Sequence, residues 1–204
     1  MTVLRDSSPP GELVSAIRDI YTPAKLNVTT EPRRETDPRG LEYQSCWFGL
    51  NGFTVAFRKA KTTPDRPGHF ATLWKRPNAG SEIMPFSSGD KMDYVVISVN
   101  SLGRHGRSYR GQFVFNKQVL IDHGIISEDT KPGKLAFRVF PPWSDSLARE
   151  SIVESQKKSL TIKKSQHMSK SAMKTQTWQL RYFLPIAADG SANLLHVQKL
   201  FGDA

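Results

Sequence analysis

Cysteine and long apolar runs are the two features that this sequence most clearly lacks. Cys46 is the only cysteine in 204 residues, so no intramolecular disulfide can form and a reducing compartment is permitted. No stretch approaches the ~18 consecutive apolar residues of a membrane-spanning helix, and residues 1–10 lack the apolar core of a secretory signal. These absences predict a cytoplasmic protein with no transmembrane segment.

The short signatures of several enzyme classes are also missing. The five histidines show no HExxH or other metal-ligand spacing, and the single cysteine adds little to any zinc site. The sequence has no Walker loop, no GxGxxG fingerprint and no GxSxG elbow, so nucleotide hydrolysis and serine hydrolase chemistry have no motif behind them. We therefore expect no cofactor, and the sequence favours a binding protein over an enzyme.

Acidic residues become scarce after residue 52, and the whole chain has a formal net charge of +10. Residues 1–45 carry six basic and seven acidic side chains, whereas 53–76 carry six and one, 100–117 four and none, and 130–181 eleven and three. An excess of one sign favours polyanions such as nucleic acid or an anionic membrane surface. A surface that is basic only for solubility is the alternative.

The length and the apolar content fit one folded domain. The chain has 204 residues, of which 38% are hydrophobic, so we predict a single domain over 1–204. Apolar residues at helical spacing after Pro10 predict an amphipathic first helix that ends before Pro23. Residues 27–40 show no apolar period and are expected to be an irregular connection, while 144–173 is expected to be an exposed basic insert, helical or partly disordered.

Strand patterns begin at Glu42. Asn51-Gly52 separates two of them and is suited to a type I′ turn, because both residues accept positive φ. Asn116 is expected to cap a short helix that stops at Gly124. The other expected elements are strands over 68–76, 94–99, 111–115, 135–140 and 178–186 and a last helix over 194–200. Together they predict an α/β fold of the mixed α+β kind, in which helices flank a central mixed, largely antiparallel sheet of about six to seven strands centred on 94–99.

A series of short motifs over residues 42–186 resembles the MepB family, which is named for a protein encoded beside a multidrug efflux pump. This resemblance implies a mixed α/β single domain with some likeness to restriction-endonuclease-type folds and a tendency to bind nucleic acid. The motifs, in chain order, are Phe57-Arg58-Lys59-Ala60-Lys61-Thr62-Thr63-Pro64, Gly68-His69-Phe70, Leu73-Trp74-Lys75-Arg76, Pro85-Phe86, Asp93, Gly111-Gln112-Phe113-Val114-Phe115, Leu120, Gly124-Ile125, Arg138-Val139-Phe140-Pro141-Pro142-Trp143 and Lys174-Thr175-Gln176-Thr177-Trp178-Gln179.

Clustered cations make nucleic acid, DNA or RNA, the first candidate partner. Guanidinium groups bind phosphate oxygens in two-point contacts, lysines release counterions there, and a tyrosine can stack on a base. The structural alternatives are that these cations belong to a solvated loop, prevent an exposed strand edge from pairing with another chain, or keep a helix face soluble. The candidate nucleic-acid-binding residues are Lys59, Lys61, Lys75, Arg76, Arg104, Arg107, Tyr109, Arg110, Lys163, Lys164, Lys174, Gln176 and Gln179.

Two further functions stay open. A divergent metal-dependent nuclease would need Glu42, Asp93 and Lys61 in one site that holds Mg²⁺ or Mn²⁺, although each acid fits equally well as a strand cap or as the partner of a surface cation. A small-molecule sensor linked to drug efflux would use a pocket lined by tryptophans, which are otherwise expected in the core. The tryptophans concerned are Trp47, Trp74 and Trp143.

Overall fold

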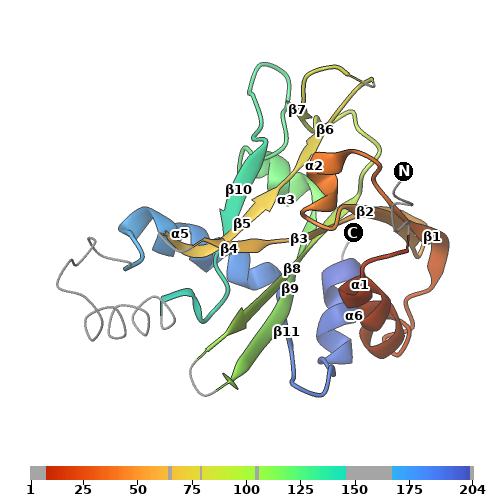
Figure 1. Cartoon of the computed structure of the whole chain (residues 1–204), viewed down its shortest axis with the longest axis vertical. Coiled ribbons are helices and arrows are strands. Elements are labelled where there is room, and N and C mark those ends of the chain that lie inside the picture. Colours follow the sequence, from red (N-terminus) through yellow and green to blue (C-terminus); the bar gives the residue numbers. More distant parts are fainter. Residues whose placement is uncertain (1–7, 64–65, 79, 104–105, 146–166, 203–204) are drawn as a thin grey trace, which may run out of the picture.

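The computed structural model describes residues 8–63, 66–78, 80–103, 106–145 and 167–202 (Figure 1). Its centre is a six-stranded sheet with the order β1-β2-β3-β8-β9-β11. Only β3 and β8 run parallel within it, so the predicted mixed, largely antiparallel sheet is confirmed. The strands are β1 (Val28–Arg34), β2 (Cys46–Leu50), β3 (Phe53–Lys59), β8 (Tyr94–Leu102), β9 (Ser108–Asn116) and β11 (Phe183–Ile186).

Two smaller sheets lie beside the central one. The three-stranded sheet has the order β10-β5-β4, and a two-stranded ribbon joins β6 to β7. The single strand expected over 68–76 is therefore split, because the Leu73 amide bonds to the carbonyl of Leu135 between the two halves. The strands are β4 (Lys61–Thr63), β5 (Arg66–Thr72), β10 (Ala136–Val139), β6 (Trp74–Lys75) and β7 (Met84–Pro85).

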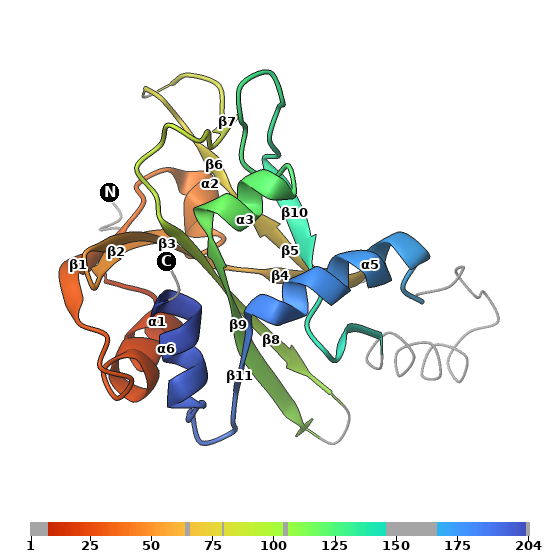
Figure 2. The ribbon, with the colours of Figure 1, turned by 180° about the vertical axis from the view of Figure 1, so that it is seen from behind.

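Helices cover both faces of the central sheet, as Figures 1 and 2 show. On one face lie α1 (Gly11–Ala16), which continues into a π-helical turn (Ile17–Tyr21), and α6 (Leu194–Gly202). The other face carries α3 (Lys117–Asp122), α5 (Lys170–Gln179) and the β10-β5-β4 sheet. No helix in the described part of the chain is long and apolar enough to cross a bilayer.

The alternation of side chains along β8 and β9 divides the core into two layers. Val96 and Val114 pack toward α1 and α6, while Val95 and Phe115 pack toward α3 and β10. Each of these four residues is fully buried. A strand that is covered on both faces is expected to be continuously apolar, so the placement of 94–99 at the centre of the sheet is confirmed.

The local turn and cap predictions are also confirmed. Asn51 and Gly52 have φ values of 50° and 85°, as a type I′ turn requires. The Asn116 side chain accepts a hydrogen bond from the Val119 amide at 2.9 Å, and Gly124 has a φ of 62° after the end of α3. These features depend on one or two residues each, which explains why sequence alone could identify them.

Residues 27–40 correct the sequence analysis. They are not an irregular connection, because β1 pairs with the edge of β2 and α2 (Pro38–Leu41) follows, capped by the Asp37 side chain at the Arg39 amide. The β1 ladder contains two register shifts and leaves most of its side chains exposed. Backbone pairing without a buried face produces no apolar alternation, so the strand has no signature in the sequence.

The strand expected over 178–186 is also shorter than predicted. Residues up to Gln179 form α5, a 3₁₀ turn follows, and only Phe183–Ile186 pairs with β9. The Ser169 side chain caps α5 at the Ala172 amide at 3.1 Å, and the helix that starts there continues through Gln179, the first two positions of the expected strand. Of the expected basic insert over 144–173, residues 146–166 lie outside the described residues.

A buried ion pair joins three strands of the central sheet. Arg58 of β3 is 2% exposed, and its guanidinium donates to Glu35 Oε1 at 2.6 Å and to the Phe57 carbonyl at 2.9 Å. The Trp47 indole of β2 donates to the same carboxylate oxygen at 2.7 Å. Burial lowers the pKa of Arg58, and the Glu35 carboxylate opposes this change. Glu35 follows directly after β1, so the pair fixes the end of that edge strand.

We predict that Glu35→Ala lowers the free energy of unfolding by about 3–5 kcal/mol, because it leaves the Arg58 charge buried without its partner. Glu31→Ala removes an exposed carboxylate from β1 and should change this free energy by less than about 0.5 kcal/mol. Urea unfolding followed by tryptophan fluorescence measures both. Equal losses in the two variants would contradict a structural role for the pair.

Candidate functional site

The strand-end cations that the sequence put forward for phosphate binding are bound to carboxylates. Lys59 contacts Glu12 at 2.5 Å, Lys61 contacts Glu42 at 2.9 Å, Lys75 contacts Asp90 at 2.5 Å and Arg76 contacts Asp37 at 2.7 Å. The hydrogen bond from Arg76 lowers the pKa of Asp37, and the one from Lys61 lowers the pKa of Glu42. Three of the four pairs are half-buried, whereas the Lys61 pair is exposed. Of these four cations, only Lys61 can therefore easily exchange its carboxylate for a new partner.

The described part of the expected basic loop, residues 106–110, lies at the far end of the β8–β9 hairpin, and Tyr109 and Arg110 belong to β9 itself. The Arg107 guanidinium lies over the Tyr109 ring at 5.1 Å, and Tyr109 stacks on Trp143 at 5.5 Å. Arg110 donates through Nη2 to two backbone carbonyls, at 3.0 and 2.8 Å. Tyr109 thus already contacts a guanidinium and an indole, and it is only partly exposed. Arg104 lies outside the described residues.

The two glutamines of the last motif, Gln176 and Gln179, form hydrogen bonds to backbone groups of another segment. Gln179 is fully buried, accepts from the Phe140 amide at 2.8 Å and donates to the Arg138 carbonyl at 2.9 Å. Gln176 donates to the Pro141 carbonyl at 2.9 Å. Both therefore bind α5 to the segment at the end of β10. Lys174 lies exposed on α5, and Lys163 and Lys164 lie outside the described residues.

The three residues of the nuclease alternative do not converge. Glu42 and Lys61 are in contact, but the Asp93 amide bonds to the Thr54 carbonyl, at the opposite end of β3. Lys61 lies seven positions after Thr54 along the chain, which corresponds to at most roughly 23 Å, and β3 extends from Phe53 to Lys59 between them. Among the described residues, no group of three histidine, cysteine, aspartate or glutamate side chains could hold a metal ion. The structure therefore does not bring Glu42, Asp93 and Lys61 together in one metal site.

Hollows lined by described residues lie around the central sheet, and three of them bear on function. The first, which we call the hairpin groove, has a volume of about 620 Å³ and lies where β4 meets the far half of the β8–β9 hairpin. Its described side chains offer hydroxyl, amide and guanidinium groups and include no carboxylate. They belong to Thr62, Asn100, Ser101, Leu102, Ser108 and Arg110.

The second hollow, the tryptophan groove, has a volume of about 660 Å³. Trp47, Trp74 and Phe86 give it an apolar wall, and Glu35 and Asp37 place two carboxylates in its lining. Two of the three tryptophans of the sensor hypothesis thus line one groove. Trp143 instead packs in the core against Tyr109 and Phe183.

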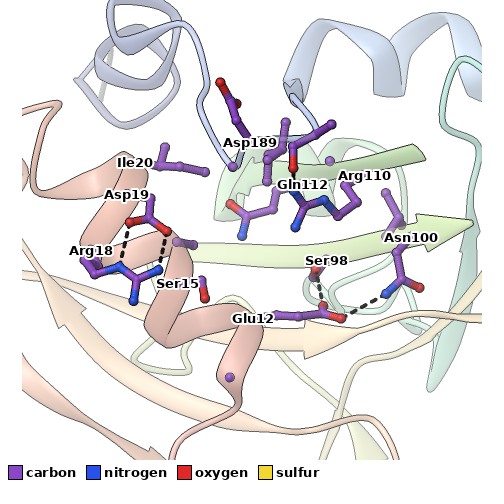
Figure 3. Close-up of a pocket in the computed structure, with 17 residues that line it drawn as sticks. Glu12, Ser15, Arg18, Asp19, Ile20, Ser98, Asn100, Arg110, Gln112 and Asp189 are labelled. Atoms are coloured by element: carbon purple, nitrogen blue, oxygen red, sulfur yellow. Dashed lines mark hydrogen bonds and ion pairs between the residues drawn. The ribbon is translucent and has the colours of Figure 1, made fainter. Parts of the chain in front are cut away.

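The third hollow, the α1 pocket, has a volume of about 380 Å³ and lies between α1, the π-helical turn, β8, β9 and the turn after β11 (Figure 3). Its lining includes three carboxylates, from Glu12, Asp19 and Asp189. Glu12 accepts hydrogen bonds from Ser98 at 2.7 Å and Asn100 at 2.9 Å. No sequence motif pointed to this pocket, because its residues come from four separate segments.

A buried histidine lies behind the hairpin groove. His69 Nε2 is 3.1 Å from Ser101 Oγ, which also accepts a hydrogen bond from the Trp143 indole at 3.0 Å. His69 Nδ1 has no hydrogen-bond partner among the described residues. Burial, together with the nearby Arg138 charge, lowers the pKa of His69 from 6.5 to about 4. The imidazole is therefore neutral at physiological pH and orients Ser101.

Fold and hollows together define a mixed α/β protein with polar hollows on both sides of an extended hairpin. A family model described as MepB-like matches residues 37–162, more than half of the chain, so the chain belongs to the MepB-like family. A solved structure described as the crystal structure of MepB is 26% identical, with a TM-score of 0.56 over 79% of this chain and 87% of that chain. No curated protein matches significantly.

His69 should make the stability of the protein depend on pH. Its pKa is lower in the folded chain, so between pH 6.5 and 4 the unfolded chain binds more protons. The stabilisation is complete above pH 6.5 and is lost as the pH falls through 4, by about 3 kcal/mol in total.

Urea unfolding of the wild type, His69→Gln and His123→Asn across this pH range tests the expectation. His69→Gln keeps a nitrogen near Ser101 and should lose much less stability on acidification than the wild type. His123→Asn removes an exposed imidazole and should keep the wild-type dependence. A His69→Gln curve parallel to that of the wild type would contradict the assignment.

Proposed function

We propose that this protein binds nucleic acid through the hairpin groove and contacts phosphates with little sequence reading. The observation that carries the proposal is the composition of the groove, in which none of the described lining residues has a carboxylate. The tryptophan groove and the α1 pocket both contain carboxylates, which repel a polyanion, and two cations of the tryptophan groove, Lys75 and Arg76, are already paired with Asp90 and Asp37. The hairpin groove is therefore the hollow best suited to a phosphate backbone.

Two cations beside the groove support this proposal. Arg107 adjoins the groove residue Ser108, and its side chain is exposed, with no carboxylate partner among the described residues. Lys61 adjoins Thr62, and its pair with Glu42 is exposed on both sides, with side-chain exposures of 43% and 67%. Exposed pairs contribute little free energy, so a phosphate can displace Glu42 at small cost. The proposal thus keeps Arg107, Arg110 and Lys61 and leaves Lys59, Lys75 and Arg76 in structural ion pairs.

We predict that Arg107→Gln weakens nucleic-acid binding on the order of threefold to tenfold at low salt. The logarithm of the binding constant falls linearly with the logarithm of the salt concentration. This dependence should become shallower by about 0.9 with duplex and about 0.7 with single strands for each phosphate that the variant no longer neutralises. Fluorescence anisotropy with labelled duplex DNA, single-stranded DNA and RNA of one sequence measures both quantities.

Lys131→Gln is the matched control, because it removes one exposed cation from the loop between α3 and β10, at the opposite end of the molecule from the hairpin tip (Figure 1). The affinity of this variant for nucleic acid should equal that of the wild type within experimental error. Equal losses in Arg107→Gln and Lys131→Gln would show attraction by net charge alone and would count against the groove. Absence of binding by the wild type at low salt would refute the function itself.

The tryptophan groove favours a second function, the binding of an aromatic cation as in a drug sensor. Trp47 and Trp74 supply aromatic surface and Glu35 and Asp37 supply negative charge in the same hollow. The lining also contains the cations Arg34, Lys75 and Arg76, so the aromatic wall rather than the local charge is what favours an aromatic cation here.

We expect tetraphenylphosphonium to quench the fluorescence of the wild type in a saturable way. Trp74→Phe should weaken this quenching severalfold, since it reduces the aromatic wall while keeping a ring in place. Trp178→Phe, a change on α5 outside the groove, should not weaken it. Quenching that rises linearly without saturation would rule the second function out.

A further inference from the structure

The floor of the α1 pocket is made of two cross-strand pairs. Ser98 lies opposite Gln112, and Asn100 lies opposite Arg110, in the register of β8 and β9. Side chains two residues apart on a strand point to the same face, so all four are directed toward α1. Figure 3 shows Arg110 and Gln112 side by side on β9, across from Glu12. The central sheet thus fixes the polar floor.

This floor carries hydrogen-bond donors that the protein does not use. Gln112 is 1% exposed, and its Oε1 accepts from the Tyr21 hydroxyl at 2.6 Å, while its amide nitrogen has no acceptor among the described residues. Arg110 uses Nη2 for the carbonyls of Ala187 and Ala188, and no described residue accepts from its Nε or Nη1. Both side chains line the open pocket, so a ligand with acceptor groups can bind these donors.

The carboxylates around the floor limit the charge of that ligand. Glu12 pairs with Lys59 at 2.5 Å, and Asp19 pairs with Arg18 at 2.6 Å. The Arg18 side chain is 71% exposed, so its pair with Asp19 is weak and the carboxylate can also accept from a ligand. Positive and negative groups nearly balance, so a simple anion or a simple cation would meet groups of its own sign.

We propose that the α1 pocket binds a small zwitterion of the amino-acid type. Its carboxylate would accept from Arg110 and Gln112, because guanidinium and carboxylate match in two-point contacts. Its ammonium would lie toward Asp19 and Asp189. A volume of about 380 Å³ suits one small molecule, and Ile20 adds apolar surface for a side chain.

This inference is separate from nucleic-acid binding. Gln112 and Asp189 do not line the hairpin groove, and Arg107 does not line the α1 pocket. Arg110 lines both, so a substitution there would not distinguish them. Either activity can therefore fail while the other is observed.

The test is NMR of the Gln112 side-chain amide, assigned by its absence from Gln112→Leu. Glycine, alanine, leucine and glutamine are titrated separately as the free amino acids, and acetate and methylammonium serve as the two halves of the zwitterion. A saturable shift with at least one amino acid, and much weaker shifts with both halves, is expected. No saturable shift with any of the four, or an equal shift with acetate alone, would overturn the proposal.

Variants then locate the ligand by calorimetry with the amino acid that binds. Asp189→Asn is an exposed change that keeps the oxygen used by the Ser191 amide, and it should weaken binding severalfold. Gln112→Leu should weaken binding on the order of tenfold. Arg107→Gln should leave it unchanged. Wild-type affinity in Asp189→Asn together with loss in Arg107→Gln would place the ligand in the hairpin groove and refute the α1 pocket.

Discussion

The long pairing of β8 with β9 is the constraint on which the rest of the structure depends. Nine residue pairs join these strands, and β3 accompanies them only along the near half. Where both faces are covered, the side chains are apolar and form the two core layers. Beyond the end of β3 the same strands carry polar side chains, which form the floor of the α1 pocket and a wall of the hairpin groove. One hairpin thus provides both the core and two hollows.

Folding cancels much of the charge asymmetry seen along the sequence. Residues 1–45 are slightly acidic and 53–76 strongly basic, but the first segment returns to the ends of β3, β4 and β6. The pairs that result are Glu12 with Lys59, Glu35 with Arg58, Asp37 with Arg76 and Glu42 with Lys61. Counting charges by segment therefore overestimates the basic surface, since the partners are distant in sequence. Arg107 beside the hairpin groove is one of the exposed cations that no described carboxylate neutralises.

Family resemblance and local chemistry predicted different parts of the molecule. The ordered motifs pointed to the MepB-like family, to which the chain belongs. Their most distinctive polar residues, such as Arg58, Gln176 and Gln179, lie in buried or backbone-bonded positions that hold the fold together. A polar residue inside a motif can thus join two elements of the fold instead of contacting a ligand. Only its hydrogen-bond partners in the folded protein distinguish the two roles.

The sequence by itself determined the class of fold, the central strand, the Asn51-Gly52 turn and the cap at Asn116, because each depends on apolar periodicity or on one or two residues with strong conformational preferences. The tertiary structure alone decided which cations are neutralised and which side chains meet in each hollow. Glu12 and Ser98 are 86 positions apart, yet they are 2.7 Å apart in space. No local preference encodes such a contact, since it arises only when α1 packs across the completed sheet.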